Sequence, residues 1–92
     1  YPTAQCNLGW MYDNGSGVEQ NYEEAVRYYG LAANQGYHRA QNNLGVMYEN
    51  GDGVEKNETL AIYWYVKAIE NGEKDCSFNN LLKIYFNGII TN

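Results

Sequence analysis

Hydrophobic residues near the start of the chain recur with the period of an α-helix. Apolar side chains at positions i, i+4, i+7 and i+8 share one face of a helix. Those positions are held by Ala4, Leu8, Met11 and Tyr12. The pattern therefore predicts a helix over about residues 3–13 with one side turned toward a core.

A second helical stripe follows a short polar segment, and it alternates small with large side chains. Its members are Ala25, Tyr28, Tyr29, Ala32 and Ala33. Asn21 is a good N-cap for this helix, and Glu24 stands at N3, as in a capping box. Gly36 stands where a glycine with positive φ often ends a helix. We expect this helix over about residues 22–35.

Both patterns occur a second time. When residues 1–36 are aligned with residues 37–72, 18 of the 36 pairs are identical, which establishes an internal repeat. A third, shorter copy follows with one inserted residue, and it keeps Asn80, Leu81, Tyr85 and Gly88. We expect repeat 1 over 1–36, repeat 2 over 37–72 and a partial repeat 3 over 73–92, as a fragment of a longer array.

A glycine stands inside the first helix of both full repeats, at Gly9 and Gly45. A mid-helix glycine costs up to about 1 kcal/mol relative to alanine. Its recurrence indicates that a neighbouring helix crosses so closely that no Cβ fits.

The repeats predict an all-α fold, an α-solenoid of antiparallel helix pairs. About five helices are expected: two pairs and a final unpaired helix over about 76–87. A unit of this kind buries its apolar face only by stacking on its neighbours. Such an array makes no long-range contacts that could bring remote segments together into a catalytic site. The architecture therefore favours binding over catalysis.

The spacing Ala-x3-Leu-Gly-x2-Tyr, Gly-x-Gly-Val, Ala-x2-Tyr-Tyr-x2-Ala-Ala-x2-Gly resembles the Sel1-like repeat, a relative of the tetratricopeptide repeat. The matching residues in the first copy are Ala4, Leu8, Gly9, Tyr12, Gly15, Gly17, Val18, Ala25, Tyr28, Tyr29, Ala32, Ala33 and Gly36. The third copy departs from the pattern, since Leu82 replaces the helix glycine and the Gly-x-Gly-Val loop is missing. The resemblance covers residues 1–88 and implies an adaptor or scaffold that binds proteins.

The glycine-rich segments 13–21 and 49–57 allow two ligand-binding interpretations. A dinucleotide loop follows a strand and has a third glycine, and neither is present here. With Gly17 or Gly53 at position 6 of a calcium-binding EF-hand loop, position 1 is Tyr12 or Tyr48, which is a poor calcium ligand. We therefore expect no cofactor and no metal, and we interpret both segments as turns between helices.

The charge of the chain narrows the class of partner. The net charge is −5, and the basic residues are scattered, so nucleic acid is not expected as a partner. No apolar run approaches the ~20 residues that span a bilayer, so membrane insertion is not expected.

Cysteine and histidine do not form a recognisable catalytic set. Cys6 and Cys76 lie far apart and outside metal-binding spacings, and His38 is the only histidine. A Cys–His dyad would lack a third, orienting group, so we do not expect an enzyme. Two unpaired thiols favour a reducing compartment such as the cytoplasm, although no signal in the sequence specifies the location.

The resemblance implies that the first helix of each repeat lines a concave face that binds a peptide or protein. The residues on the outer side of these helices are Thr3, Cys6, Trp10, Asp13 and Asn14, then Arg39, Asn42, Val46, Glu49 and Asn50, then Asn79, Lys83 and Asn87. Trp10 has two interpretations: an exposed binding residue, or a residue that packs on a preceding repeat. A spacer without its own partner and self-association through the open ends of the array are alternative functions.

Overall fold

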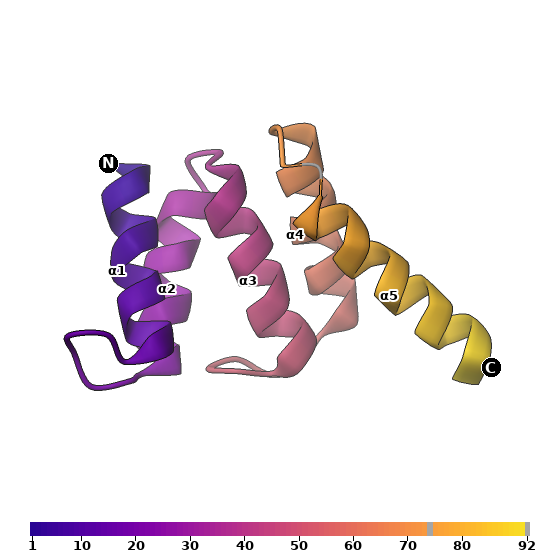
Figure 1. Ribbon diagram of the computed structural model, residues 1–92, viewed down its shortest axis with the longest axis horizontal. Coiled ribbons are helices and arrows are strands. Elements are labelled where there is room, and N and C mark those ends of the chain that lie inside the picture. The colour runs from indigo at the N-terminus through magenta and orange to yellow at the C-terminus, as the bar shows by residue number, and fades with distance from the viewer. Residues whose placement is uncertain (74, 92) are drawn as a thin grey trace.

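The computed structural model describes residues 1–73 and 75–91, with side chains described through residue 88. Its five helices are α1 (Pro2–Asn14), α2 (Tyr22–Ala33), α3 (His38–Asn50), α4 (Glu58–Glu70) and α5 (Cys76–Thr91) (Figure 1). The predicted all-α fold is confirmed, and no strand occurs in the described part of the chain. Lys74 and Asn92, which belong to the predicted third repeat, lie outside the described residues.

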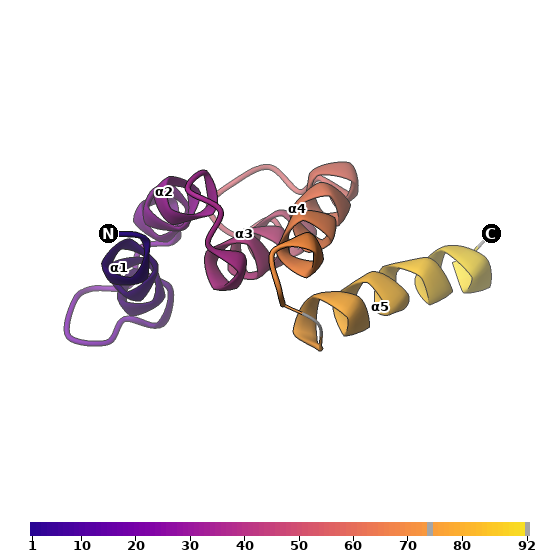
Figure 2. The ribbon, with the colours of Figure 1, turned by 90° about the horizontal axis from the view of Figure 1, so that it is seen from above.

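The helices stack into an elongated array that measures 41 × 25 × 17 Å. Helices α1, α3 and α5 lie along one side of the array, and α2 and α4 lie along the other (Figure 2). Each helix packs against the next one in the chain. This is the predicted solenoid arrangement, and it places the first helix of every repeat on the same side of the molecule.

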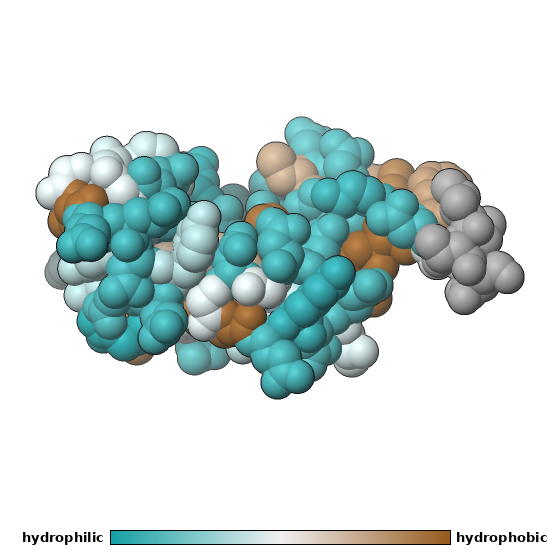
Figure 3. Space-filling model, turned by 90° about the horizontal axis from the view of Figure 1, so that it is seen from below, coloured by the Kyte–Doolittle hydropathy of each residue, from teal (hydrophilic) through white to brown (hydrophobic). Residues whose placement is uncertain are grey.

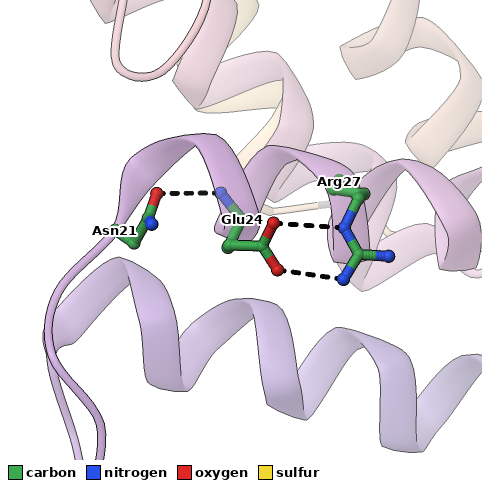
Figure 4. A network of polar contacts seen from close by, with 3 residues as sticks. All are labelled: Asn21, Glu24 and Arg27. Carbon is green, nitrogen blue, oxygen red and sulfur yellow. Dashed lines mark hydrogen bonds and ion pairs between the residues drawn. The ribbon is translucent and has the colours of Figure 1, made fainter.

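Asparagine caps begin the second helix of both repeats. The side chain of Asn21 accepts a hydrogen bond of 3.1 Å from the backbone N–H of Glu24 (Figure 4), and Asn57 accepts one of the same length from Leu60. The other half of the predicted capping box does not form. The Glu24 carboxylate instead pairs with Arg27, at 2.9 Å (Figure 4), and the backbone N–H of Asn21 donates to the carbonyl of Tyr12.

The two helices of each repeat meet where a tyrosine ring lies on a glycine. A Cβ built on Gly9 would lie 2.7 Å from the ring of Tyr29, and one built on Gly45 would lie 2.7 Å from the ring of Tyr65. Both tyrosines are fully buried. The predicted close crossing at these glycines is confirmed.

The glycine-rich segments turn the chain between the helices of a repeat. Gly15 and Gly17 both have positive φ, as do Gly51 and Gly53, so these positions use the left-handed backbone region that glycine tolerates. The second segment also contacts the first repeat, since a Cβ on Gly53 would lie 2.6 Å from the backbone carbonyl of Tyr22. The interpretation of these segments as turns agrees with this geometry.

The predicted apolar face of the first helix is buried in the second repeat but not in the first. Leu44 is 3% exposed, because Ala40, Leu44 and Met47 pack with residues of α2. Leu8, the counterpart of Leu44, is 37% exposed, and Ala4 is also exposed. The same sequence pattern therefore lies in the core in α3, where α2 of the preceding repeat packs against it. In α1 the equivalent face lies at the surface, because α2 packs on a different face of that helix.

The last helix is longer than predicted. It runs from Cys76 to Thr91 rather than ending near residue 87, because no Gly-x-Gly segment follows to turn the chain. The carboxylate of Glu73 accepts a hydrogen bond of 2.7 Å from the backbone N–H of Cys76 and so satisfies one donor of the first turn.

Candidate functional site

The predicted partner-binding residues come from α1, α3 and α5, which lie together on one side of the array (Figure 2). Residues one repeat apart form rows across these helices. One row consists of Trp10, Val46 and Lys83, and another consists of Cys6, Asn42 and Asn79. The members of these rows differ widely in how accessible they are.

Trp10 is an accessible member of the set. Its residue surface is 50% exposed. One turn further along α1, Asn14 is exposed and donates its side-chain amide to the backbone carbonyl of Trp10. An indole beside a polar amide at the surface can offer both apolar contact and hydrogen bonding to a partner.

Most of the polar members of the set are also exposed. They are Thr3, Arg39, Asn50, Asn79, Lys83 and Asn87. Lys83 is partly engaged, because its ammonium group lies 3.4 Å from the carboxylate of Glu49 on α3. The remaining exposed residues present amides, a hydroxyl and a guanidinium group along the side of α1, α3 and α5.

Asn42 contacts the neighbouring helix rather than open solvent. Its side-chain oxygen accepts hydrogen bonds from the Ser77 hydroxyl, at 2.8 Å, and from the Asn80 amide, at 3.3 Å. Ser77 is fully buried. These contacts join α3 to α5, so the structure gives Asn42 a structural role that the repeat spacing did not reveal.

Asp13 and Glu49 are equivalent residues that hold the buried tyrosines. The Tyr29 hydroxyl donates to Asp13 at 3.0 Å, and the Tyr65 hydroxyl donates to Glu49 at 2.6 Å. Burial and the adjacent carboxylate raise the pKa of both tyrosines well above the ordinary value. Burial also raises the pKa of Asp13, although the hydrogen bond from Tyr29 opposes this shift. Both carboxylates therefore belong mainly to the joint between the helices of a repeat.

Cys6 does not lie on the accessible surface, which corrects its assignment to the partner-binding face. It is 2% exposed and packs with residues of α2 and α3. The Asn43 amide on α3 lies 4.0 Å from its sulfur atom. Burial raises the pKa of the Cys6 thiol, with Arg39 and Asn43 acting in the opposite direction, and a buried thiol of raised pKa is a poor nucleophile. Val46 is half-buried.

Two hollows of the surface include residues that the sequence did not single out. A hollow of about 250 Å³ lies between the 33–36 turn and α4, and its walls include Tyr63, Trp64 and Lys67. Trp64 is half-buried and packs against the core cluster. A polar hollow of about 160 Å³ is lined by Glu49, Asn50, Lys56, Glu58, Ile84 and Asn87. Only the packing of separate segments forms these hollows, so no local sequence signal marks them.

Neither a metal centre nor a membrane span is found in the described residues. Within 1–73 and 75–91, no group of three or more His, Cys, Asp or Glu side chains is placed to hold a metal ion. No helix in these ranges is long and apolar enough to cross a membrane.

A sequence model of the Sel1 repeat matches the chain twice, over residues 2–37 and 38–73. Together the two matches cover most of the chain. No curated protein matches the chain in sequence.

Solved structures of the same repeat class are similar to this chain in both sequence and fold. A Sel1 repeat protein from Oxalobacter formigenes is 47% identical over 82% of this chain, with a TM-score of 0.79. The protective antigen c5321 of uropathogenic Escherichia coli, described as having an SLR fold, is 41% identical over 96%, with a TM-score of 0.90. Helicobacter pylori cysteine rich protein B is 31% identical over 82%, with a TM-score of 0.78.

This chain spans only part of those proteins. It covers 31% of the Oxalobacter formigenes chain, 19% of the Escherichia coli chain and 56% of the Helicobacter pylori chain. Proteins of this repeat class are generally non-catalytic scaffolds that take part in protein interactions.

Proposed function

This chain belongs to the Sel1 repeat family, and from that membership we propose that it binds a peptide or a protein surface along α1, α3 and α5. These are the first helices of the repeats, on which the sequence led us to expect a concave binding face. The proposal assigns the partner contacts to the accessible members of the predicted set, and it leaves Cys6, Asp13, Asn42 and Glu49 to the scaffold.

The observation that carries this proposal is the half-exposed indole of Trp10. Its equivalents in the other repeats are Val46 and Lys83, so the packing of the repeat does not require an indole at this place. Tryptophan is enriched among the few residues that dominate binding energy in protein interfaces. The amides of Asn14, Asn50 and Asn79 lie on the same series of helices and supply hydrogen-bond donors and acceptors for a peptide backbone.

A peptide library displayed on phage tests this proposal, with the 92-residue chain as the immobilised target. The chain has two tryptophans, so a Trp64→Phe background leaves Trp10 as the only indole. Binding of a selected peptide should then change the emission of Trp10. In the natural background, Trp10→Ala should weaken peptide affinity by roughly 30-fold, which corresponds to a hot-spot loss of about 2 kcal/mol.

The matched control is Tyr63→Ala on the opposite side of the array, because Tyr63 is 49% exposed and Trp10 is 50% exposed. This control should leave peptide affinity unchanged, and circular dichroism should show full helix content in both variants. If Trp10→Ala has no effect, the assignment to α1, α3 and α5 is wrong. A library that yields no binding peptide would favour a spacer without its own partner.

A further inference from the structure

The hollow of about 250 Å³ between the 33–36 turn and α4 lies at the junction of the two full repeats. Its walls come from three segments of the chain. Asn34 belongs to the turn after α2, Gln41 belongs to α3, and Tyr63 and Lys67 belong to α4. Every lining residue lies within the two Sel1 matches, over residues 2–37 and 38–73. The hollow is therefore a feature of the middle of the array and does not depend on its ends.

A network of amide hydrogen bonds fixes the buried part of this hollow. Gln41 is 3% exposed. Its Nε2 donates to the backbone carbonyl of Ala33, and its Oε1 accepts from the Asn71 amide, both at 3.0 Å. The Asn71 amide also donates to the backbone carbonyl of Lys67, so both of its N–H groups are used. The network joins the ends of α2 and α4 to α3, so the hollow is held in shape before any ligand binds.

The amide pair recurs in the first repeat, whereas two other lining residues do not. Gln5 and Gln35 stand one repeat before the two amides of this network, and Gln35 donates to Gln5 in the same way. Tyr63 and Lys67, in contrast, stand where the first repeat has an arginine and a leucine. The packing of the repeat therefore uses the amide pair but does not require a tyrosine and a lysine beside it.

Lys67 gives the hollow a positive charge. Among the described residues it is the only charged one in the lining, and it makes no ion pair with any of them. Its ammonium group lies 5.7 Å from the centre of the Tyr63 ring, and that ring packs edge-on against Trp64, with the ring centres 5.1 Å apart. The chain has a net charge of −5, and the face shown in Figure 3 is largely hydrophilic. Lys67 is therefore a cation without an ionic partner on a polar molecule of negative net charge.

These groups favour a carboxylate over other ligands. An ammonium group and a carboxylate form strong, charge-assisted hydrogen bonds, and the exposed side-chain amide of Asn34 supplies further donors. A cationic group would be repelled by Lys67. A wholly apolar group would remove the ammonium group and the amide from water without replacing their hydrogen bonds.

The end of α2 opposes an anion only weakly. The free carbonyl groups at the C-terminus of a helix carry a partial negative charge. At this end, however, the carbonyl of Ala33 accepts from the N–H of Gly36, at 3.0 Å, and from the Gln41 amide. The carbonyl of Ala32 accepts from the N–H of Tyr37, at 3.3 Å. These donors offset the partial charge that the end of α2 would otherwise present to the hollow.

We propose that this hollow is a second partner site, which binds one carboxylate group of a peptide. The carboxylate comes from an acidic side chain or from a C-terminus. Lys67 and Asn34 donate hydrogen bonds to it, and the rings of Tyr63 and Trp64 contact the adjoining carbon atoms. The volume of about 250 Å³ lies below the roughly 300–1,000 Å³ of pockets that bury a drug-sized ligand, so the hollow fits one side chain or one chain end. The site shares no residue with the predicted set on α1, α3 and α5, so it does not rest on the function proposed above.

Nitrogen-15 NMR of the 92-residue chain at neutral pH tests the proposal with three capped tripeptides. Acetyl-Ala-Glu-Ala-amide carries a side-chain carboxylate, acetyl-Ala-Ala-Ala carries a C-terminal one, and acetyl-Ala-Gln-Ala-amide carries neither. At least one of the first two should shift the Trp64 indole signal and the Asn34 and Asn71 amide signals, with a Kd on the order of 1 mM. The one that binds identifies the source of the carboxylate. The glutamine peptide should bind at least about tenfold more weakly.

Two lysine variants test the role of the charge. Lys67→Gln should weaken binding of the carboxylate peptide about tenfold. The matched control Lys56→Gln removes a positive charge from the hollow that Glu49 and Glu58 also line, and it should leave binding unchanged. Circular dichroism should show full helix content in both variants. Trp10→Ala should also leave carboxylate binding unchanged, so a failure of this proposal is distinguishable from a failure of the function proposed above.

Three results would overturn the proposal. The first is that the glutamate and glutamine peptides shift the three signals equally. The second is that neither carboxylate peptide shifts them at concentrations up to about 20 mM, well above the expected Kd. The third is that Lys56→Gln and Lys67→Gln weaken binding equally, which would indicate a general effect of net charge.

Discussion

At the scale of single residues, each helix pair depends on a tyrosine that packs on a glycine and donates to a carboxylate. Tyr65 lies against Gly45 and bonds to Glu49, and Tyr29 makes the same contacts with Gly9 and Asp13. The glycine gives the ring its close approach, and the carboxylate satisfies the buried hydroxyl. Packing and hydrogen bonding therefore act on the same side chain.

Two glycine-to-alanine substitutions should change stability in opposite directions. Gly45→Ala places a Cβ 2.7 Å from the Tyr65 ring and 3.2 Å from the Ala61 carbonyl oxygen, so overpacking of about 1–3 kcal/mol should outweigh the gain in helix propensity. Gly30→Ala meets nothing within 4 Å in α2 and should stabilise by up to about 1 kcal/mol. Thermal melting should show shifts of about 4–8 °C per kcal/mol. An unchanged melting temperature for Gly45→Ala would contradict the role of the close contact.

Asp13 should make stability depend on pH in a defined direction. Burial raises the pKa of its carboxyl group in the folded state above the ordinary value. The proton is therefore held more tightly in the folded chain, so the folded state gains stability as pH falls through the raised pKa and loses it as pH rises. Asp13→Asn keeps an acceptor for Tyr29 and removes the charge.

We therefore expect Asp13→Asn to raise the melting temperature slightly at neutral pH, and the difference from the unmodified chain should shrink at about pH 3, where the carboxyl group is protonated. Melting curves at both pH values measure this. Glu19→Gln, at an exposed carboxylate of the 13–21 segment, serves as the control for the loss of one negative charge. A variant that is less stable than the unmodified chain at neutral pH would show that the charge is favourable.

At the scale of helices, the sequence predicted the elements well because periodicity, caps and turn glycines are local signals. Asn21 and Asn57 begin their helices as expected, whereas α2 ends at Ala33 rather than near residue 35 and α5 extends to Thr91 rather than ending near residue 87. The accessibility of the site was harder to predict. Cys6 and Trp10 are four residues apart on one face of α1, yet α3 covers the first and leaves the second exposed. The crossing of α1 and α3 decides this, and periodicity within one helix does not specify how two helices cross.

The turn between α3 and α4 should contribute more to stability than its counterpart in the first repeat. Gly53 and Gly17 both have positive φ, so alanine at either place is strained by about 1 kcal/mol. At Gly53 the new Cβ would also lie 2.6 Å from the Tyr22 carbonyl, whereas Gly17 has only the end of Met11, at 3.5 Å. Urea denaturation should therefore show a clearly larger loss for Gly53→Ala than for Gly17→Ala. Equal losses would mean that the contact between this turn and α2 relaxes freely.

At the scale of the whole molecule, each described helix contacts the next helix of the chain, and the first helices of successive repeats also touch, as α3 and α5 do. Helix α5 is held by α4 and by polar contacts to α3, whereas α1 and α2 lie at the far end (Figure 1). In such an array stability is approximately a sum of local units and their interfaces. The last helix should therefore open without unfolding of the first repeat.

The substitution Asn42→Ala tests whether α5 opens without unfolding of the first repeat. The substitution leaves the buried Ser77 hydroxyl without its acceptor and also removes the contact with Asn80, at a cost of about 1–3 kcal/mol. Because those contacts join α3 to α5, hydrogen exchange of the α5 amides should accelerate roughly 5- to 150-fold, while the amides of α2 keep their protection. Mass spectrometry of peptic fragments resolves the two regions. The control Asn50→Ala, at an exposed residue of the same helix, should leave the exchange rates of both regions unchanged. If Asn42→Ala instead accelerates exchange equally across the chain, the array unfolds as one cooperative unit.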